Sequence, residues 1–262
     1  MLCNVNEVVL DSDQRLKHIN HLRQVEGLTD ENIRKLIEKY KNLLTENAGK
    51  GSTVAFLNDI LDHLDKTGYI ESPDSCYSGL ALTGVKGAEK DALLEDHFLI
   101  KEAIQEGGVQ KNYDPAEAPF NPQEQLVGEP QEVSDIDTLM VISSMFFTGT
   151  NLAASTGLGT EIRTANIYNK FPIEFVKKGI YVSRMGTGAR RVIVLEYQDL
   201  KKQKPQVVDV IGRLREFSPG VGTCPVHGNT LVGFRDGQTT CLPGLIQKEF
   251  PQFNYDFSHY QK

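Results

Sequence analysis

The sequence lacks the long apolar run, the basic block and the dense cysteine pattern that mark several large classes of protein. No apolar stretch approaches the ~18 residues of a membrane-spanning helix, so we expect no membrane partner. The net charge of −7 argues against a protein that binds duplex nucleic acid, because such proteins neutralise phosphates with basic residues. A small anionic ligand stays compatible with this charge, because it needs only a few local donors.

Neither the start of the chain nor the spacing of its cysteines indicates a secreted protein. Residues 1–13 lack the basic segment and the apolar segment of a secretory signal peptide. The four cysteines, Cys3, Cys76, Cys224 and Cys241, are widely spaced. We therefore expect a cytoplasmic protein with reduced thiols rather than a disulfide framework.

What the chain does have is an ordinary globular composition, with 39% hydrophobic and 24% charged residues among 262. This length allows one large or two modest domains with a sizeable core. Apolar residues recur at helical spacing through 11–69, which predicts a helical N-terminal region over 1–72. That region either forms a partner or oligomer surface or packs on the main domain. Residues 205–262 open with a predicted helix over 207–217, and we expect an irregular C-terminal extension after it.

Residues 73–204 alternate short apolar strands with helices. The pattern predicts strands over 80–83, 109–113, 138–143, 173–176 and 191–195, helices over 90–106 and 158–169, and loops over 115–130 and 146–154. Such alternation is typical of a parallel sheet with helices on both faces. Ligands of these sheets bind beyond the carboxyl ends of the strands, where Gly84, Asp114 and Ser143 stand.

The strongest functional signal is a glycine-rich turn that opens the helix expected over 158–169. It runs from Ser155 to Glu161 and reads S-x-G-x-G-x-E, with glycines at Gly157 and Gly159. Turns of this kind bring backbone N–H groups and a helix N-terminus close to an anion. The Ser155 hydroxyl can either cap the helix or contact a phosphate. Glu161 can either favour the helix dipole or act on the ligand that the turn holds.

This motif resembles the active-site turn of the nucleoside 2-deoxyribosyltransferase-like superfamily. The resemblance extends more loosely over residues 78–199, and it includes the run over 137–141. It implies a flavodoxin-like α/β domain over 73–204, a homo-oligomer, no cofactor, and Glu161 as the nucleophile that attacks C1′ of a nucleotide or nucleoside. The residues that it implies around this small molecule are Gly84, Lys86, Asp114, Asp137, Ser155, Gly157 and Gly159.

The implied chemistry is cleavage of an N-glycosidic bond, which builds positive charge at C1′ that a carboxylate can stabilise or capture as an ester. The departing base also needs a proton, and we favour Asp135 over Asp114 and Asp137 as its donor. Members of the superfamily that transfer bases commonly have an acid at the position of Ser155. Members that hydrolyse nucleoside 5′-monophosphates have a phosphate-contacting serine there. Ser155 therefore favours hydrolysis and release of a free base.

Two other functions stay open. One is base exchange, in which a second base rather than water resolves the glycosyl intermediate. The other is a nucleotide-binding sensor or regulatory module without turnover. It is favoured by Ala81, which stands where the family usually has an aromatic hydroxyl that holds the glutamate. Tyr77 or Tyr113 could supply that hydroxyl instead.

A separate cluster near the end of the chain offers metal ligands. Cys224 and His227 form a C-x-x-H motif, which is half of a zinc site, and Cys241 adds a third ligand. Cys3, Cys76 or His259 could be the fourth. Because a paired C-x-x-C motif is missing, the alternative is a loop with a buried cysteine and an exposed histidine.

Overall fold

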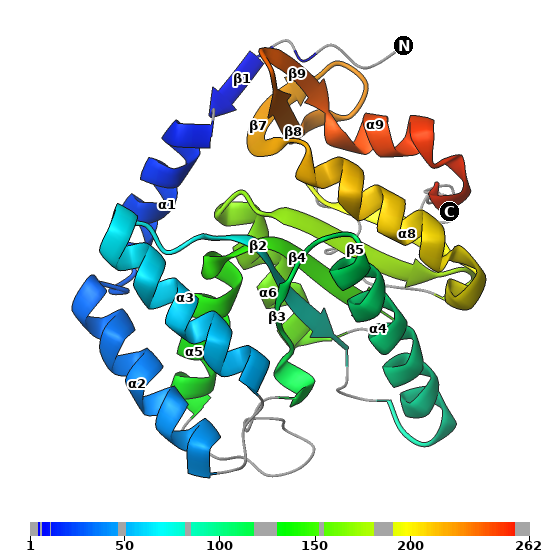
Figure 1. The fold of residues 1–262 in the computed structure, drawn as a ribbon. Helices are drawn as coiled ribbons and strands as arrows, with labels where there is room; N and C mark the ends of the chain where they lie inside the picture. Colours follow the sequence, from blue (N-terminus) through cyan, green and yellow to red (C-terminus); the bar gives the residue numbers. More distant parts are fainter. Residues whose placement is uncertain are drawn as a thin grey trace.

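A computed structural model of the chain describes residues 5, 7–10, 12–46, 51–81, 85–117, 130–151, 155–180 and 191–254. In Figure 1 a central sheet lies between two groups of helices, and a smaller sheet lies at one side of it. None of the helices in the described ranges is long and apolar enough to cross a bilayer.

The central sheet is parallel and has the order β3-β2-β4-β5-β6. Its strands are β2 (Ser72–Leu80), β3 (Lys111–Tyr113), β4 (Ser144–Asn151), β5 (Phe171–Lys177) and β6 (Ile193–Tyr197). The first strand of this sheet, β2, lies inside the order rather than at its end, and helices form the crossovers from β2 to β3, from β3 to β4 and from β4 to β5. This arrangement confirms the predicted α/β class and is consistent with a flavodoxin-like fold.

Alternate residues of each strand face two different helix layers. Tyr77 of β2 and Phe147 of β4 are register partners on one face. That face is covered by α1 (Ser12–Val25), α2 (Asp30–Glu46), α3 (Gly51–Thr67), α5 (Pro130–Ser143) and α6 (Thr156–Ile167). Cys76 and Phe146 are partners on the opposite face, which is covered by α4 (Ala88–Glu106) and α8 (Leu200–Arg215). Figure 1 shows α4 and α8 together on one side of the sheet.

The N-terminal helices are packed on the sheet and share its core. Ile33, Ile37 and Tyr40 lie on one buried stripe of α2, as the helical spacing predicts, and belong to the same apolar cluster as Tyr77 and Phe147. The described contacts therefore support the interpretation that this region packs on the main domain. Its predicted boundary at residue 72 stays a prediction.

A buried ion cluster joins α1 to the amino-terminal edge of the sheet. Glu71, just before β2, accepts hydrogen bonds from Arg15 Nη1 at 2.7 Å and from Lys170 Nζ at 2.5 Å. The two cations hold the pKa of the Glu71 carboxyl at about 2, although burial acts in the opposite direction. Because all three side chains are buried, we expect the loss of one member to be strongly destabilising.

Two predicted elements are wrong in the segment that precedes the glycine-rich turn. Residues 138–143, predicted as a strand, form the end of α5, and the strand β4 occupies most of the predicted loop over 146–154. The misleading run is the block Leu139, Met140, Val141 and Ile142, in which every side chain is buried. A helix that is buried on all sides has the continuous apolar sequence of a buried strand, so the period of 3.6 disappears. Similarly, the sequence predicts a strand that starts at Leu80, whereas β2 ends there. The prediction missed β2 because its serine- and proline-containing sequence resembles that of a loop.

The described part of the C-terminal extension, residues 205–254, forms regular strands and helices rather than irregular structure. The strands β7 (Ser218–Cys224), β8 (Gly228–Arg235) and β9 (Gln238–Cys241) form an antiparallel sheet with β1 (Glu7–Leu10), in the order β1-β7-β8-β9. Helix α9 (Leu242–Glu249) follows, and short 3-10 turns stand at Pro115–Glu117 and Pro251–Phe253. Glycines and prolines in β7 and β8 concealed these strands. The pair Asp236 and Gly237, with φ of 47° and 75°, is the tight hairpin signal that could have revealed them.

Candidate functional site

The carboxylate of Glu161 lies beside the carboxyl end of β2. Ser155 caps α6, and its Oγ accepts a hydrogen bond from the Leu158 N–H at 3.3 Å. This cap fixes the start of α6 over the sheet. A methyl group placed on Gly79 would lie 2.6 Å from Glu161 Oε2 and 3.0 Å from Leu158 Cδ1. The missing side chain at Gly79 therefore leaves room for the carboxylate to approach the backbone of the sheet. This is the place where ligand sites of parallel sheets are expected.

Three tyrosines form a stack across β2, β3 and α2, and one of them, Tyr77, lies near this carboxylate. The ring centroids of Tyr77 and Tyr113 are 5.4 Å apart, and Tyr77 also stacks on Phe147 at 5.6 Å. The hydroxyls of Tyr40 and Tyr113 are 3.1 Å apart, and Tyr113 Oη donates to Asp137 Oδ1 at 3.4 Å. The stack thus connects Asp137 of α5 to the strand that contacts Glu161.

The Tyr77 hydroxyl lies near the two carboxylates. Burial, and then the charges of Asp137 and Glu161, raise the pKa of Tyr77 well above its ordinary value. The side chain is 0% exposed, yet no described group meets hydrogen-bond distance and angle with its hydroxyl. The hydroxyl is therefore near both acids but forms no hydrogen bond with either. A buried donor of this kind is unusual and is expected at functional sites.

Burial raises the pKa of both carboxyls, and the charge of Asp137 raises that of Glu161 further. Both residues are half-buried. The hydrogen bond that Asp137 accepts from Tyr113 lowers the pKa of Asp137 in part. Two acids that interact in this way cannot both ionise readily, so the pair holds a proton near neutral pH. The arrangement can present one acid and one base to a ligand.

Asp135, which we favoured as proton donor, is placed differently. Its Oδ1 accepts a hydrogen bond from Gln131 Nε2 at 2.7 Å, one turn earlier in α5. Asp137 is the aspartate of α5 whose charge reaches Glu161. The two aspartates are two positions apart, which places them on nearly opposite sides of a helix. Because the sequence predicted a strand from residue 138, helical periodicity could not be used to decide which of the two aspartates faces the sheet.

Asp114 is buried in a network of its own at the end of β3. Its carboxylate accepts hydrogen bonds from His97 Nε2 at 3.0 Å, from Lys101 Nζ at 2.6 Å and from the Ala116 N–H at 2.9 Å. These groups hold the pKa of Asp114 at about 2 against the effect of burial. His97 Nδ1 in turn is 3.0 Å from Thr150 Oγ1. This network fixes the edge of the sheet, and no described contact joins it to Glu161.

The glycines of the turn leave space above the start of α6. A methyl group on Gly159 would meet no atom within 4 Å, and one on Gly157 would meet only Ser155 Oγ at 3.8 Å. Internal packing therefore does not require glycine at either position. Lys86, just before α4, is exposed. Gly84 lies outside the described residues.

A buried pair that the sequence did not single out lies on the same face of the sheet as Tyr77. Asn151 Nδ2 donates to Glu174 Oε1 at 2.7 Å, while Glu174 Oε2 and Asn151 Oδ1 have no partner among the described residues. Burial raises the pKa of Glu174 to about 7. The signal was a single acid within the apolar strand Phe171–Lys177, which is a rare position for a glutamate.

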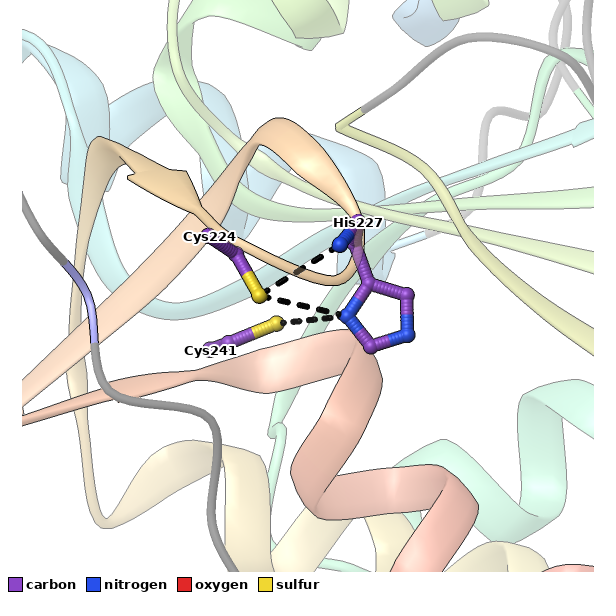
Figure 2. Close-up of side chains that lie close together, drawn as sticks. All are labelled: Cys224, His227 and Cys241. Carbon is purple, nitrogen blue, oxygen red and sulfur yellow. Dashed lines mark hydrogen bonds between the residues drawn. The ribbon is translucent and has the colours of Figure 1, made fainter.

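The predicted metal ligands come together in the C-terminal sheet. Figure 2 shows Cys224, His227 and Cys241 pointing toward one another. His227 Nδ1 is 3.4 Å from Cys224 Sγ and 3.3 Å from Cys241 Sγ, and all three ligand atoms lie within 4.8 Å of one another. Cys76, a suggested fourth ligand, is in the central sheet beside Ser78 and Thr148. Cys3 and His259 lie outside the described residues.

Comparisons with known proteins identify no family or function for this chain. The sequence matches no family model, and no curated protein matches it at a significant level. A crystal structure of a conserved protein from Enterococcus faecalis V583 is similar over 53% of this chain and 99% of its own, with 13% identity and a TM-score of 0.38. At that score the similarity supports no conclusion about fold or function.

Proposed function

We propose that the protein cleaves the N-glycosidic bond of a nucleoside 5′-monophosphate or nucleoside and releases the free base. One observation carries this proposal. The Glu161 carboxylate lies against Gly79 at the carboxyl edge of the sheet, beside a second acid and a buried tyrosine hydroxyl. A pair of carboxyls and a fixed donor are the groups that this reaction needs.

In the proposed reaction, a Glu161 oxygen attacks C1′ while the bond from C1′ to the base nitrogen breaks. The base leaves with a proton from Asp137. Water then attacks C1′ of the glycosyl ester, which returns the carboxylate to Glu161 and a proton to Asp137. The raised pKa values of Asp137 and Glu161 let the pair hold one proton near neutral pH, and the proposed reaction needs that proton on Asp137 when the ligand is bound. A developing positive charge on the sugar would favour ionised Glu161, whose charge is disfavoured by burial before the ligand binds.

Asp137 thus takes the role for which the sequence favoured Asp135. Similarly, Tyr77 takes the role of the aromatic hydroxyl that Ala81 does not provide. Because the hydroxyl of Tyr77 is near Glu161, the observation that favoured a sensor without turnover loses weight. Base exchange stays the runner-up, because both reactions share the glycosyl ester and differ only in the group that resolves it.

The start of α6 supports a phosphate-bearing substrate. Ser155 Oγ accepts the Leu158 N–H, so its own proton stays available to a phosphate oxygen. The open space above Gly157 and Gly159 gives a phosphate access to the helix N-terminus. The homo-oligomer and the cytoplasmic location that the sequence suggests stay predictions.

The test is a base-release assay on a panel of nucleoside 5′-monophosphates and nucleosides. We expect the Glu161→Gln and Asp137→Asn variants to lose release by orders of magnitude, because each removes a group that acts in the transition state. Asp135→Asn is the matched control on the same helix and should keep the wild-type rate. Equal losses in both aspartate variants would contradict the assignment of Asp137, and undiminished release in Glu161→Gln would contradict the reaction itself.

A second substitution separates substrate class from reaction type. Ser155→Ala should weaken nucleotide binding by about 1–3 kcal/mol, the range for a lost hydrogen bond to a charged group. Its activity on unphosphorylated nucleosides should barely change. Equal losses on nucleotides and nucleosides would reject the phosphate assignment and favour the transferase.

A further inference from the structure

The three side chains of Figure 2 come from the carboxyl ends of β7 and β9, which run in the same direction on either side of β8, and from the turn after β7. Cys224 is the last residue of β7, and His227 lies in the tight turn that leads to β8. Cys241 ends β9 and is the N-cap of α9, where it makes no side-chain capping bond. The antiparallel pairing of β7, β8 and β9 brings these positions together although 17 residues separate the cysteines. The cluster is thus built by the fold.

The separations of the ligand atoms match a tetrahedral metal site. Zinc bonds of about 2.0–2.3 Å at tetrahedral angles place neighbouring ligand atoms roughly 3.5–3.8 Å apart. His227 Nδ1 is 3.4 and 3.3 Å from the two sulfurs. The two sulfurs lie within 4.8 Å of each other, so a metal ion could bind with side-chain movements of about 1 Å or less.

The second nitrogen of His227 fixes the state of the first. His227 Nε2 is 3.2 Å from Gln247 Oε1, an acceptor, so Nε2 carries the proton. In a neutral imidazole, Nδ1 then presents its lone pair, and it faces both sulfurs. One lone pair accepts a hydrogen bond from one thiol, whereas a metal ion satisfies both thiolates and the nitrogen together. An N–H that donates to a carbonyl is also the usual way in which metal-binding histidines are oriented.

We propose that Cys224, His227 and Cys241 bind a structural zinc ion. Two thiolates and an imidazole are ligands that select zinc over calcium, magnesium or manganese. The cysteines are 1% and 0% exposed, which fits a structural site better than one that exchanges substrate. The backbone N–H of His227 also donates to Cys224 Sγ at 3.4 Å and so supports a thiolate there. On binding, both thiols release their protons to the solvent.

The expected role of this ion is to connect the turn between β7 and β8 to the junction of β9 and α9. The strands concerned are short and rich in glycine, so they bury few large side chains. A metal ion supplies stability that such a small sheet lacks. Because the ligands belong to the antiparallel sheet, the site is separate from Glu161 and independent of the proposed reaction.

The direct test is metal analysis of the full-length protein, purified under reducing conditions and supplied with zinc chloride alone. We expect about one zinc per chain, and after exchange with cobalt we expect the absorption bands of a tetrahedral thiolate site. Cys224→Ala and Cys241→Ala should lower the zinc content to near zero. Cys76→Ser, which changes a buried cysteine of the other sheet, and His21→Ala, which changes an exposed histidine, are the matched controls and should keep the metal.

A second measurement on the unaltered chain covers the case in which the cysteine variants do not fold. Alkylation of the thiols is followed peptide by peptide, before and after chelation of zinc. Chelation should expose Cys224 and Cys241 to alkylation and lower the melting temperature, while the reactivity of Cys76 stays the same. Reduced protein that contains no zinc and takes none up, or a disulfide between Cys224 and Cys241 under these conditions, would overturn the proposal.

Discussion

The buried Tyr77 hydroxyl lowers the stability of the folded protein, because it has no hydrogen-bond partner among the described residues. A buried hydroxyl without a partner is worth about 1–3 kcal/mol of lost solvation, and that of Tyr77 has no hydrogen bond among the described residues. The neighbouring Tyr113 differs, because its hydroxyl bonds to Tyr40 and Asp137. Under the proposed function, the Tyr77 hydroxyl serves as a donor for Glu161 and contributes little to folding.

We therefore expect Tyr77→Phe to leave the free energy of unfolding nearly unchanged or slightly raised. Base release should nevertheless fall by about 10²-fold, as for the removal of other transition-state donors. Tyr113→Phe is the matched variant and should lower stability by about 1 kcal/mol, because it breaks bonds that exist in the folded state. Urea unfolding and the base-release assay together check this. A large loss of stability in Tyr77→Phe, with activity unchanged, would contradict the assignment.

At this scale the sequence identified Glu161 correctly as a residue at the sheet edge, because the glycine-rich turn gives its position in the helix. It included Asp137 among the ligand-binding residues but favoured Asp135 as the proton donor. That choice depends on the direction in which α5 presents each residue, and the run over 139–142 carries no helical period because all its side chains are buried. Burial on every side removes the information that periodicity would supply.

At the scale of elements, the contact between α6 and β2 holds Glu161 in the position that the proposed reaction needs. Gly79 and Gly149 are register partners on adjacent strands, and both lie under Leu158. They differ in one respect. A methyl group on Gly79 would meet Glu161 Oε2 at 2.6 Å, whereas one on Gly149 would meet only the flexible ends of Leu158 and Phe147, at 3.2 Å and beyond.

Gly79→Ala should consequently displace the carboxylate of Glu161 and reduce base release by about 10²-fold, the effect of a misplacement near 1 Å. Gly149→Ala should cost about 1–3 kcal/mol of stability through its contact with Leu158 and keep most of the activity per folded molecule. Kinetics and thermal melts of both variants check the contrast. If Gly149→Ala were as inactive as Gly79→Ala, crowding of Leu158 rather than of Glu161 would explain the loss.

The sequence predicted the alternation of strands and helices because the buried strands of a parallel sheet are short apolar runs between turn residues. It missed the antiparallel C-terminal sheet for the opposite reason. Strands such as Ser218–Cys224 contain glycine and proline, which are depleted from strands in general. If zinc holds this sheet, its stability comes from three side chains, and periodicity cannot reveal that source.

For the whole molecule, the titrating groups predict stability that falls at both ends of the pH range. The carboxyls of Glu71 and Asp114 have pKa values held at about 2, below those of the unfolded chain. Their contribution is present above pH ~4 and is lost as the pH falls toward 2. Asp137 and Glu161 act in the opposite way. Their raised pKa values mean that the folded state keeps a proton that the unfolded chain releases.

The free energy of unfolding should therefore decrease as the pH rises from about 4 into the neutral range and then level off above the raised pKa values. Glu161→Gln removes one titrating group and the repulsion that it causes. This variant should be close to the wild type in stability at pH ~4 and more stable at pH ~8, by on the order of 2 kcal/mol. Urea unfolding across this range checks the slope. A slope that is the same in both proteins would show that Glu161 titrates normally.

The central claim is that Glu161 forms a bond to C1′ of a nucleotide, and mass spectrometry of the intact protein tests it most directly. The protein is incubated with nucleoside 5′-monophosphates that carry a 2′-fluorine, which slows hydrolysis of a glycosyl ester. We expect one equivalent of free base and a mass increase of one sugar phosphate, located on the peptide that contains Glu161 and missing in Glu161→Gln. Absence of both base and adduct across the panel, or an adduct that persists in Glu161→Gln, would contradict the account.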